Sequence, residues 1–489
     1  MSIAKKAISG ALWMSGISYI GFAVNFGIQL TMVRLLVPED FGMFALGLAG
    51  ANILFILFNW NFSMAVIQIQ DAEDLLDTAF YLSFFAGIII LVVGGAISLV
   101  LARYYSISSV TVFFIICALQ PFKGCASIYS ASIEKDLKFK GNAIVRGLSA
   151  NLSGFLAVLM ASLGFGVWSL LGRELLSTGF LLFGMWTISS YRFKRHFSRQ
   201  TAKALLKFGY KRFFIRGLEI VYFNGPIFLI GSFVTPGELG LFGQAFYLAN
   251  LPNTFLAPVQ QTVAFSVYSK IQGDKQKLQQ AFDLNYFFSI RFLIPISLIV
   301  YMFPEQILRF LYGAKWLQAA PILQYLSLYV VFTALLMSAI TFLYSLRMKD
   351  ILKVYTAQIV VFAILVVAFM GQFESKVVLA GAAYSLSTLI GLSIGLYFMI
   401  NTGIKIALRN LFLLPFGIAL GIAGIWQLLV APQIDFAHLD KISIFGIMVM
   451  AFILFVLTMF LSQLKRSHYY FKYVSGLMLQ GHRQKLETA

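Results

Sequence analysis

Charged residues are scarce in this sequence. They make up 11% of its 489 residues, whereas 60% of the residues are hydrophobic. Soluble globular domains average about 25% charged residues, so the composition excludes that class. Apolar stretches long enough to cross a bilayer recur from one end of the chain to the other, which is typical of a polytopic membrane protein.

Cysteine and histidine are scarce as well. The two cysteines, Cys117 and Cys125, lie on one predicted helix, about 12 Å apart. That separation is too long for a disulfide, so both are predicted to be small core residues. The four histidines have no ligand spacing, which argues against a metal site. Since the sequence has no GxxxxGK[ST] phosphate loop, it predicts no ATPase of its own.

The hydrophobic pattern predicts an all-α polytopic membrane protein with about fourteen transmembrane helices. The first apolar run ends at Arg34 and has the length of a span rather than of a cleavable signal. The predicted spans are 9–34, 42–66, 78–102, 108–132, 142–163, 167–190, 213–234, 239–266, 284–303, 318–343, 354–371, 377–400, 411–430 and 442–462.

The net charge of +18 is distributed unevenly between the two sides of the membrane. With the N-terminus inside, five of the 37 Lys and Arg lie within spans and six in outer loops, which leaves 26 in inner segments. This asymmetry predicts that both termini are cytoplasmic and that the basic excess faces anionic inner-leaflet lipid, not nucleic acid.

A repeat divides the predicted spans into two sets. Residues 38–52, PEDFGMFALGLAGAN, return as residues 236–250, PGELGLFGQAFYLAN. Because the two copies open spans 2 and 8, the sequence predicts two six-helix bundles related by a pseudo-twofold axis along the membrane normal. The predicted domains are a lobe at 1–190, a basic cytoplasmic linker at 191–212, a lobe at 213–400, and two extra helices with a basic tail at 401–489.

Several motifs resemble the Wzx-type polysaccharide-unit flippases of the multidrug/oligosaccharidyl-lipid/polysaccharide (MOP) exporter superfamily. They are RLLVPEDFG at 34–42, GFGVWSL at 164–170, LANLP and YSKIQGDKQKL within 248–278, and YGAKWLQAAPILQ at 312–324. The resemblance is weak beyond about residue 400. Asn224 departs from the family pattern, since members often carry an acid there.

The resemblance implies a flippase, and no enzyme, that moves undecaprenyl-pyrophosphate-linked oligosaccharide across a bacterial cytoplasmic (inner) membrane by alternating access. It implies a polysaccharide polymerase as a partner and no cofactor beyond H⁺ or Na⁺ as a coupling ion. An ion-coupled drug or metabolite exporter and a peptidoglycan-precursor flippase are the alternatives. A membrane polymerase or ligase is disfavoured because no outer loop exceeds about fifteen residues.

Charged residues inside spans usually face an interior cavity. Five cations are therefore candidates for holding the substrate's phosphates: Arg291, Arg173, Lys123, Arg216 and Arg146. The structural alternatives are that Arg146 snorkels, that Lys123 packs beside the kink at Pro121, and that Arg216 neutralises Glu219.

Glu174 and Glu219 are the acids inside spans, so either could bind a coupling ion or serve as a fixed counter-ion. Amides could line a sugar-binding cavity, because they both donate and accept hydrogen bonds, or they could join helices instead. The candidates are Asn25, Gln29, Asn52, Asn59, Gln244, Asn250 and Asn253.

Overall fold

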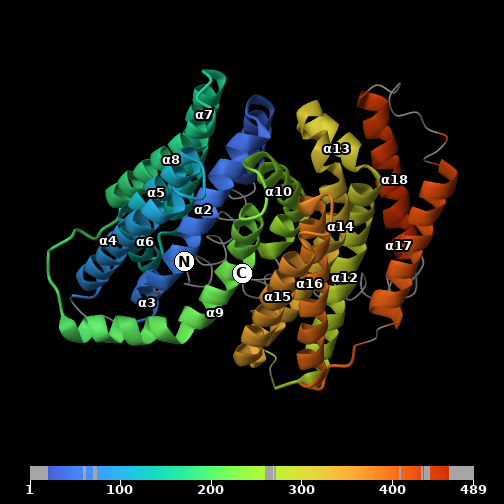
Figure 1. Cartoon of the computed structure of the whole chain (residues 1–489). Coiled ribbons are helices and arrows are strands. Elements are labelled where there is room, and N and C mark those ends of the chain that lie inside the picture. Colours follow the sequence, from blue (N-terminus) through green and yellow to red (C-terminus); the bar gives the residue numbers. More distant parts are fainter. Residues whose placement is uncertain are drawn as a thin grey trace. The chain divides into compact units, whose positions relative to one another are not determined.

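The protein is all-α, as the hydrophobic pattern predicts (Figure 1). The computed structural model describes residues 20–58, 62–69, 74–258, 268, 271, 273–406, 409–430, 433 and 441–461. Within these ranges eight helices are long and apolar enough to cross a membrane, and three shorter apolar helices accompany them. The predicted multi-pass membrane architecture is therefore confirmed.

The chain forms two compact units. Unit 1 contains Met1–Gln244, Leu311–Trp316 and Ala363–Val377, and unit 2 contains Ala245–Phe310, Leu317–Phe362 and Val378–Ala489. The division falls inside one helix at Gln244, not within the predicted linker 191–212. The predicted six-helix lobes rest on a sequence repeat rather than on contacts, so they stay a prediction.

The first described helix of unit 1 is Ile20–Leu35. The further helices of the unit are α2 (Pro38–Phe58), α3 (Phe62–Gln68), α4 (Leu75–Leu101), α5 (Ile107–Ala118), α6 (Gln120–Lys135), α7 (Phe139–Ser162), α8 (Val167–Ile188), α9 (Arg199–Gly231) and the start of α10 (Pro236–Pro258). Apolar residues of α2, α4, α5 and α8 form one core, which includes the free cysteine Cys117.

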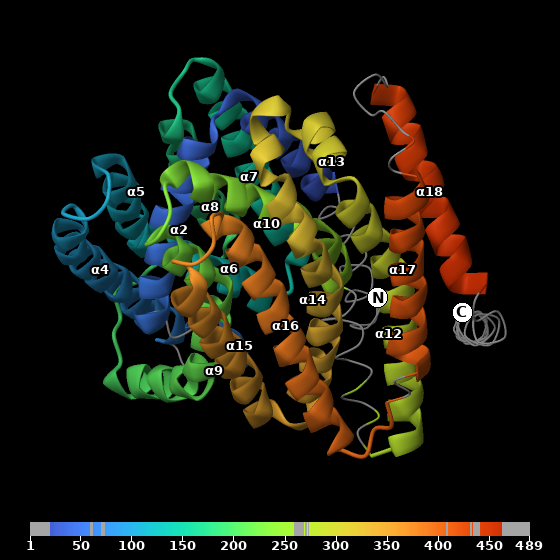
Figure 2. The same ribbon diagram turned by 45° about the vertical axis from the view of Figure 1, so that its right-hand side comes forward.

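Unit 2 is organised around α12 (Lys275–Met302), which contacts α14 (Ala320–Leu346) along its length. Next come α13 (Pro304–Leu311), most of α15 (Met348–Phe369), α16 (Lys376–Ile400), α17 (Leu414–Ile425) and α18 (Lys441–Leu461). Among the described residues, short 3₁₀ and π segments lie at Ala314–Ala319, which begins in unit 1, and at Arg409–Leu413 and Trp426–Val430. Figure 2 shows α17 and α18 beside α12, which both of them contact.

One predicted span is divided. Predicted span 108–132 consists of α5 and α6, and the break is at Leu119, immediately before Gln120 and Pro121. Proline has no N–H and fits the first turn of a helix, so the chain ends α5 there and starts α6. In predicted span 42–66, α2 and α3 lie on either side of residues 59–61, which are outside the described residues.

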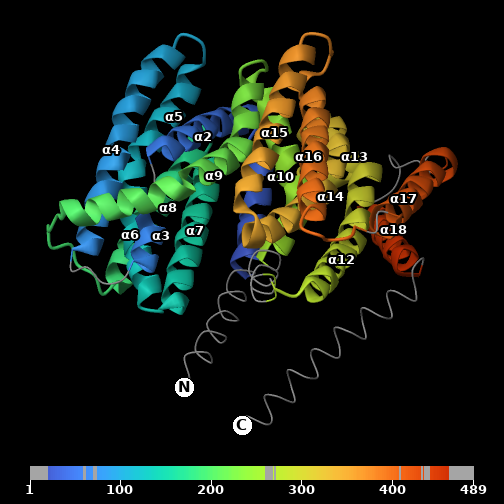
Figure 3. The same ribbon diagram turned by 90° about the horizontal axis from the view of Figure 1, so that it is seen from below.

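The predicted linker 191–212 is not a separate element. Its first part, residues 191–198, is not helical, whereas the remainder belongs to α9, a 33-residue helix that continues into predicted span 7. Ala202 and Leu205 of α9 are buried, and Lys203 and Lys207 are exposed. This amphipathic first part of α9 lies across the ends of α3 and α4 (Figure 3).

Residues 189–198, called the strap below, are tied to Asp77 in the first turn of α4. Asp77 is 4% exposed, and its carboxylate accepts hydrogen bonds from the backbone N–H of Lys194 at 3.1 Å and of His196 at 3.0 Å. The Tyr191 hydroxyl also donates to it. Burial and this hydrogen bond raise the pKa of Tyr191. One buried acid therefore satisfies backbone groups that no helix serves.

Replacing Asp77 with alanine should release the strap. It leaves the two N–H groups and the Tyr191 hydroxyl without their acceptor, which we expect to cost about 3 kcal/mol of folding free energy. Limited trypsin digestion of the purified protein should then cut at Arg192 and Lys194 much faster than in the parent. Asp77→Asn keeps one acceptor oxygen and should be intermediate. Equal cutting rates in all three proteins would contradict the anchoring role.

Candidate functional site

Unit 1 brings together polar side chains from three helices around Asn25. Arg173 of α8 donates from Nη2 to Asn25 Oδ1 at 2.7 Å. Asn25 donates from Nδ2 to Asn151 Oδ1 of α7 at 2.9 Å. All three side chains are half-buried. A guanidinium held by amides in this way keeps its charge and a fixed orientation, as an anion-binding group needs.

A second charged group lies directly beside this network in the sequence. Lys123 of α6 donates to Glu174 of α8 at 2.8 Å, and each side chain is 29% exposed. Arg173 and Glu174 are adjacent on α8, so their side chains point about 100° apart. The pair Lys123–Glu174 has no net charge, and it lies beside the Arg173 network in the sequence.

Two further amide pairs join helices of unit 1. Gln29 lies one helical turn beyond Asn25 and donates at 3.2 Å to Gln244, the last residue of α10 that belongs to unit 1. Asn52 of α2 donates to Asn224 of α9 at 3.0 Å. Asn224 is the residue that departs from the family pattern. Besides accepting from Asn52, it donates from Nδ2 to the backbone oxygen of Ile220, one helical turn earlier.

Arg146 lies apart from the Asn25 network. Its Nε donates to Asn142 at 3.1 Å, and its Nη2 donates to Ser130 at 2.8 Å. Asn142 in turn donates to Glu134 at 2.6 Å. Arg146 is exposed and joins α6 to α7 through these partners, so the contacts describe a helix-joining role.

The contacts of three candidate residues are not described in the structure. Asn59 lies outside the described residues, and the side chain of Arg216 is not described although its backbone belongs to α9. Glu219 of α9 is half-buried and takes part in a side-chain interaction. Their predicted roles stay predictions.

The remaining candidates belong to unit 2. Arg291 is 1% exposed, lies 3.5 Å from the centre of the Phe287 ring and donates to the Phe287 carbonyl at 3.2 Å. It was expected on the wall of an open cavity, but this conformation buries it because its helix face packs inside the unit. Contact with phosphates stays a prediction. Asn250 accepts from Tyr329 at 3.1 Å, and Asn253 is buried.

The motifs of the sequence meet in unit 1 as well. An ideal Cβ on Gly42 would lie 1.6 Å from the Pro236 carbonyl oxygen, and one on Gly240 would lie 1.8 Å from that of Pro38. The two copies of the repeat therefore cross with their backbones in contact, and each glycine admits the other copy's carbonyl. The repeated acids also act alike, since Asp40 accepts from the Val37 N–H and Glu238 from that of Thr235.

The YGAKW motif packs on this crossing. Trp316 is fully buried, donates from Nε1 to the Val33 carbonyl at 3.0 Å, and meets the Phe41 ring edge-on at 5.6 Å. Gly166 of the GFGVWSL motif adopts φ +54° and would place a Cβ 3.0 Å from Asp40. Sequence reasoning found these motifs but not their mutual contact. It also missed Asn151, an amide in predicted span 5 whose polarity was the available signal.

Residues 31–321 match the family model described as a polysaccharide biosynthesis protein. ExoT, a succinoglycan biosynthesis transport protein of Rhizobium meliloti, is 24% identical over 66% of this chain and 66% of its own length. WzxC, a lipopolysaccharide biosynthesis protein of Escherichia coli, is 24% identical over 67% of each chain. The matches thus span about two thirds of the length of these relatives.

Among solved structures, the lipid II flippase MurJ in an inward closed conformation resembles this fold. Its TM-score is 0.70 at 14% identity, and the match covers 95% of this chain and all of that one. This likeness concerns the fold alone and confirms the predicted MOP-type architecture. Because the family model matches more than half of the sequence, the chain belongs to the polysaccharide biosynthesis protein family, the group to which its Wzx-like motifs pointed.

Proposed function

We propose that this protein is a flippase for an oligosaccharide carried on undecaprenyl pyrophosphate. It would move this lipid from the cytoplasmic to the outer leaflet of a bacterial inner membrane by alternating access, with both termini in the cytoplasm. The supporting observation is the half-buried Arg173–Asn25–Asn151 network, which joins the helix Ile20–Leu35 to α7 and α8 in a chain of the polysaccharide biosynthesis family.

The substrate chemistry matches this network. A pyrophosphate that leaves water loses its hydration, and this cost is large unless cations and hydrogen-bond donors replace the water. The Arg173 guanidinium has five N–H donors and can hold a phosphate with two parallel hydrogen bonds while Asn25 keeps it oriented. The amides of Asn25 and Asn151 can meanwhile exchange partners with sugar hydroxyls, because they both donate and accept.

Glu174 is our choice for the coupling ion. When H⁺ binds Glu174, or when Na⁺ replaces Lys123 at its carboxylate, the Lys123 ammonium loses its partner. The Lys123 ammonium is then available to attract a phosphate. When the ion leaves, the pair re-forms and the attraction weakens. Substrate affinity therefore depends on ion occupancy, which couples the two binding events.

A cellular assay separates this function from the alternatives. Deleting the gene should remove the surface polysaccharide and leave lipid-linked oligosaccharide accumulated on the cytoplasmic leaflet, and a plasmid copy should restore both. Increased drug sensitivity with normal polysaccharide would instead indicate the exporter. Loss of wall synthesis, with lipid-linked peptidoglycan precursor retained inside, would indicate the precursor flippase.

The Glu174→Gln variant tests the coupling. Because the Lys123–Glu174 pair is 29% exposed on each side, we expect its loss to change folding stability by less than about 1 kcal/mol. Glutamine resembles the protonated acid, so the variant should still bind substrate, but its transport should no longer respond to an ion gradient. Proteoliposomes with and without a pH or Na⁺ gradient give the measurement. Normal gradient dependence in this variant would rule out Glu174.

A further inference from the structure

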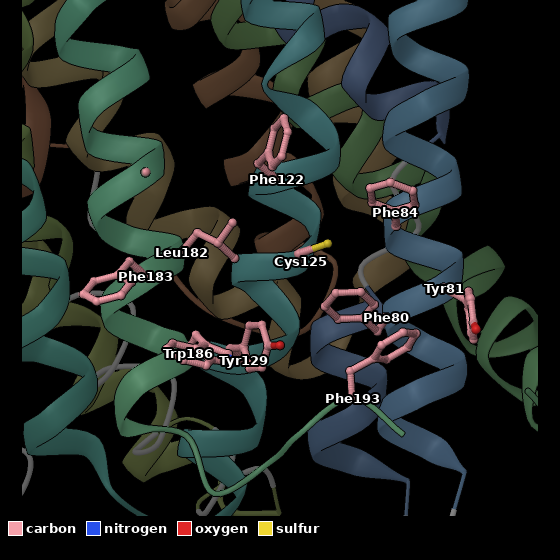
Figure 4. Close-up of a pocket in the computed structure, with 11 residues that line it drawn as sticks. Phe80, Tyr81, Phe84, Phe122, Cys125, Tyr129, Leu182, Phe183, Trp186 and Phe193 are labelled. Atoms are coloured by element: carbon pink, nitrogen blue, oxygen red, sulfur yellow. The ribbon is translucent and has the colours of Figure 1, made fainter. Parts of the chain in front are cut away.

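A cavity of about 600 Å³ opens between α4, α6 and α8 in unit 1 (Figure 4). Almost all of its wall is apolar, and most of the wall is aromatic. Its lining residues include Phe80 of α4, Phe122 of α6, Gly179 and Trp186 of α8, and Phe193 of the strap. The cavity lies outside the Arg173 network, and the proposed transport mechanism does not use it.

The strap closes one end of the cavity. Phe193 packs against Phe80 with ring centres 4.6 Å apart and against Tyr81 at 5.0 Å. Its place is fixed because the neighbouring backbone N–H of Lys194 is bonded to Asp77. The cavity therefore has a firm aromatic floor, made by the segment that leaves α8 and enters α9.

The opposite wall is open to the surroundings. Phe122, Phe183 and Trp186 are among the cavity's exposed aromatic residues. Helix α4 and the stretch Ile107–Lys135, which contains α6, are long and apolar enough to span the bilayer, so the open side of the cavity faces the depth at which acyl chains are present. An apolar cavity of this size that opened onto the bilayer would be filled by a hydrocarbon chain, since vacant space forfeits dispersion contacts.

Positive charge stands at the floor of this cavity. The Arg192 guanidinium lies 5.2 Å from the Trp186 ring, while its Nη1 donates to the Ser189 carbonyl at 2.6 Å. Lys194 and Arg195 follow in the same strap and are exposed. A chain that enters the aromatic cavity would thus place a phosphate at its head within reach of these cations, and such contacts favour anions.

We propose that this cavity is a binding site for one anionic phospholipid of the membrane. One acyl chain lies between α4, α6 and α8 above Phe193, and the phosphate contacts Arg192, Lys194 and Arg195 of the strap. The lipid is not cargo: it fastens the strap to the bundle and so fixes the direction in which the chain enters the amphipathic first part of α9. This role is additional to the proposed transport function.

Gly179 gives direct access to the cavity by mutation. A Cβ at this position meets nothing within 4 Å, so Gly179→Phe can project a ring into the cavity without disturbing the backbone. Gly147 of α7 is the matched control, because a Cβ there also meets open space and the residue does not line the cavity. For the headgroup, the Lys194→Gln/Arg195→Gln double variant is matched by Lys203→Gln/Lys207→Gln on the exposed face of α9.

The experiment measures lipid that purifies with the protein, by native mass spectrometry and by extraction. We expect about one anionic phospholipid per parent chain, and roughly tenfold less in Gly179→Phe, since the ring replaces the chain's apolar contacts. Lys194→Gln/Arg195→Gln should lose it as well, whereas Gly147→Phe and Lys203→Gln/Lys207→Gln should keep it. After delipidation, phosphatidylglycerol should raise the Tm of the parent but not of Gly179→Phe.

Other probes decide what the site holds. Phosphatidylcholine should raise the Tm less than phosphatidylglycerol, and inorganic phosphate should have no effect. The proposal would be overturned if the two phospholipids raised the Tm equally, or if the two double variants lost equal amounts of phospholipid. It would also be overturned if a folded Gly179→Phe protein retained the phospholipid. Displacement of the phospholipid by equimolar polyprenyl phosphate would overturn it too, because the cavity would then hold the carrier's tail. If these tests contradict the lipid site but Gly179→Phe exports polysaccharide normally, the proposed transport function still stands.

Discussion

Replacing Gly42 with alanine should prevent the protein from folding stably in the membrane. The added Cβ would lie 1.6 Å from the backbone oxygen of Pro236, and a backbone atom cannot rotate away as a side chain can. The starts of α2 and α10 would have to separate, and we expect this to cost about 3 kcal/mol or more. Membrane abundance and the Tm of the purified protein measure the loss.

The symmetry of the crossing sharpens this test. Gly240→Ala places a Cβ 1.8 Å from the Pro38 oxygen, so it should destabilise the protein about as much as Gly42→Ala. The double variant should lose less than the sum of the two, because either Cβ alone already forces the helices apart. Gly243→Ala, one turn further along α10, meets nothing within 4 Å and is the control. Wild-type stability in Gly42→Ala would show that the close approach does not occur.

The repeat illustrates what the sequence could predict. Matching letters at Pro38 and Pro236 indicated that two segments have the same local structure, and both do start helices with an acid bonded back to a backbone N–H. Their mutual contact could not be predicted, because similarity between segments carries no information on which surfaces meet. The glycines at 42 and 240 were visible, but their need for close approach appears only once the helices are placed.

Arg291 illustrates a different limit. Counting residues along a span gives the depth of a side chain but not the face of the helix that it occupies. Arg291 shares a face with Phe287, four residues earlier, and that face packs inside unit 2. The role of Asp77 could not be predicted for a third reason: its partners in the strap are more than 100 residues away in the sequence. An acid in the first turn of a helix looks locally like a simple helix-dipole residue.

The amphipathic part of α9 was within reach of sequence reasoning. Lys203 and Lys207 are four residues apart and exposed, with Leu205 buried between them on the other face. This spacing is typical of a surface helix. The predicted linker nevertheless ends at residue 212, whereas the helical backbone continues unbroken to Gly231.

Arg173→Ala should strongly reduce polysaccharide export while the protein remains folded. Losing one charge-assisted contact to phosphate costs about 1.5–3 kcal/mol, which corresponds to roughly a ten- to hundredfold drop in transport rate. Arg173→Lys should keep part of the activity, because an ammonium still attracts phosphate but cannot bind it with a planar fork. Surface polysaccharide, normalised to folded protein in the membrane, is the measurement.

Arg146→Ala is the matched control, since it removes the same kind of side chain from the same unit. Arg146 joins Asn142 to Ser130 and lies apart from the Asn25 network, so its loss should lower the Tm while the protein that does fold exports normally. Arg291→Ala should also reduce folded protein, because it empties a buried position. The decisive quantity is export per folded molecule. If Arg173→Ala matches the parent on that scale, Arg173 only joins helices through Asn25, and phosphate recognition must lie with other residues.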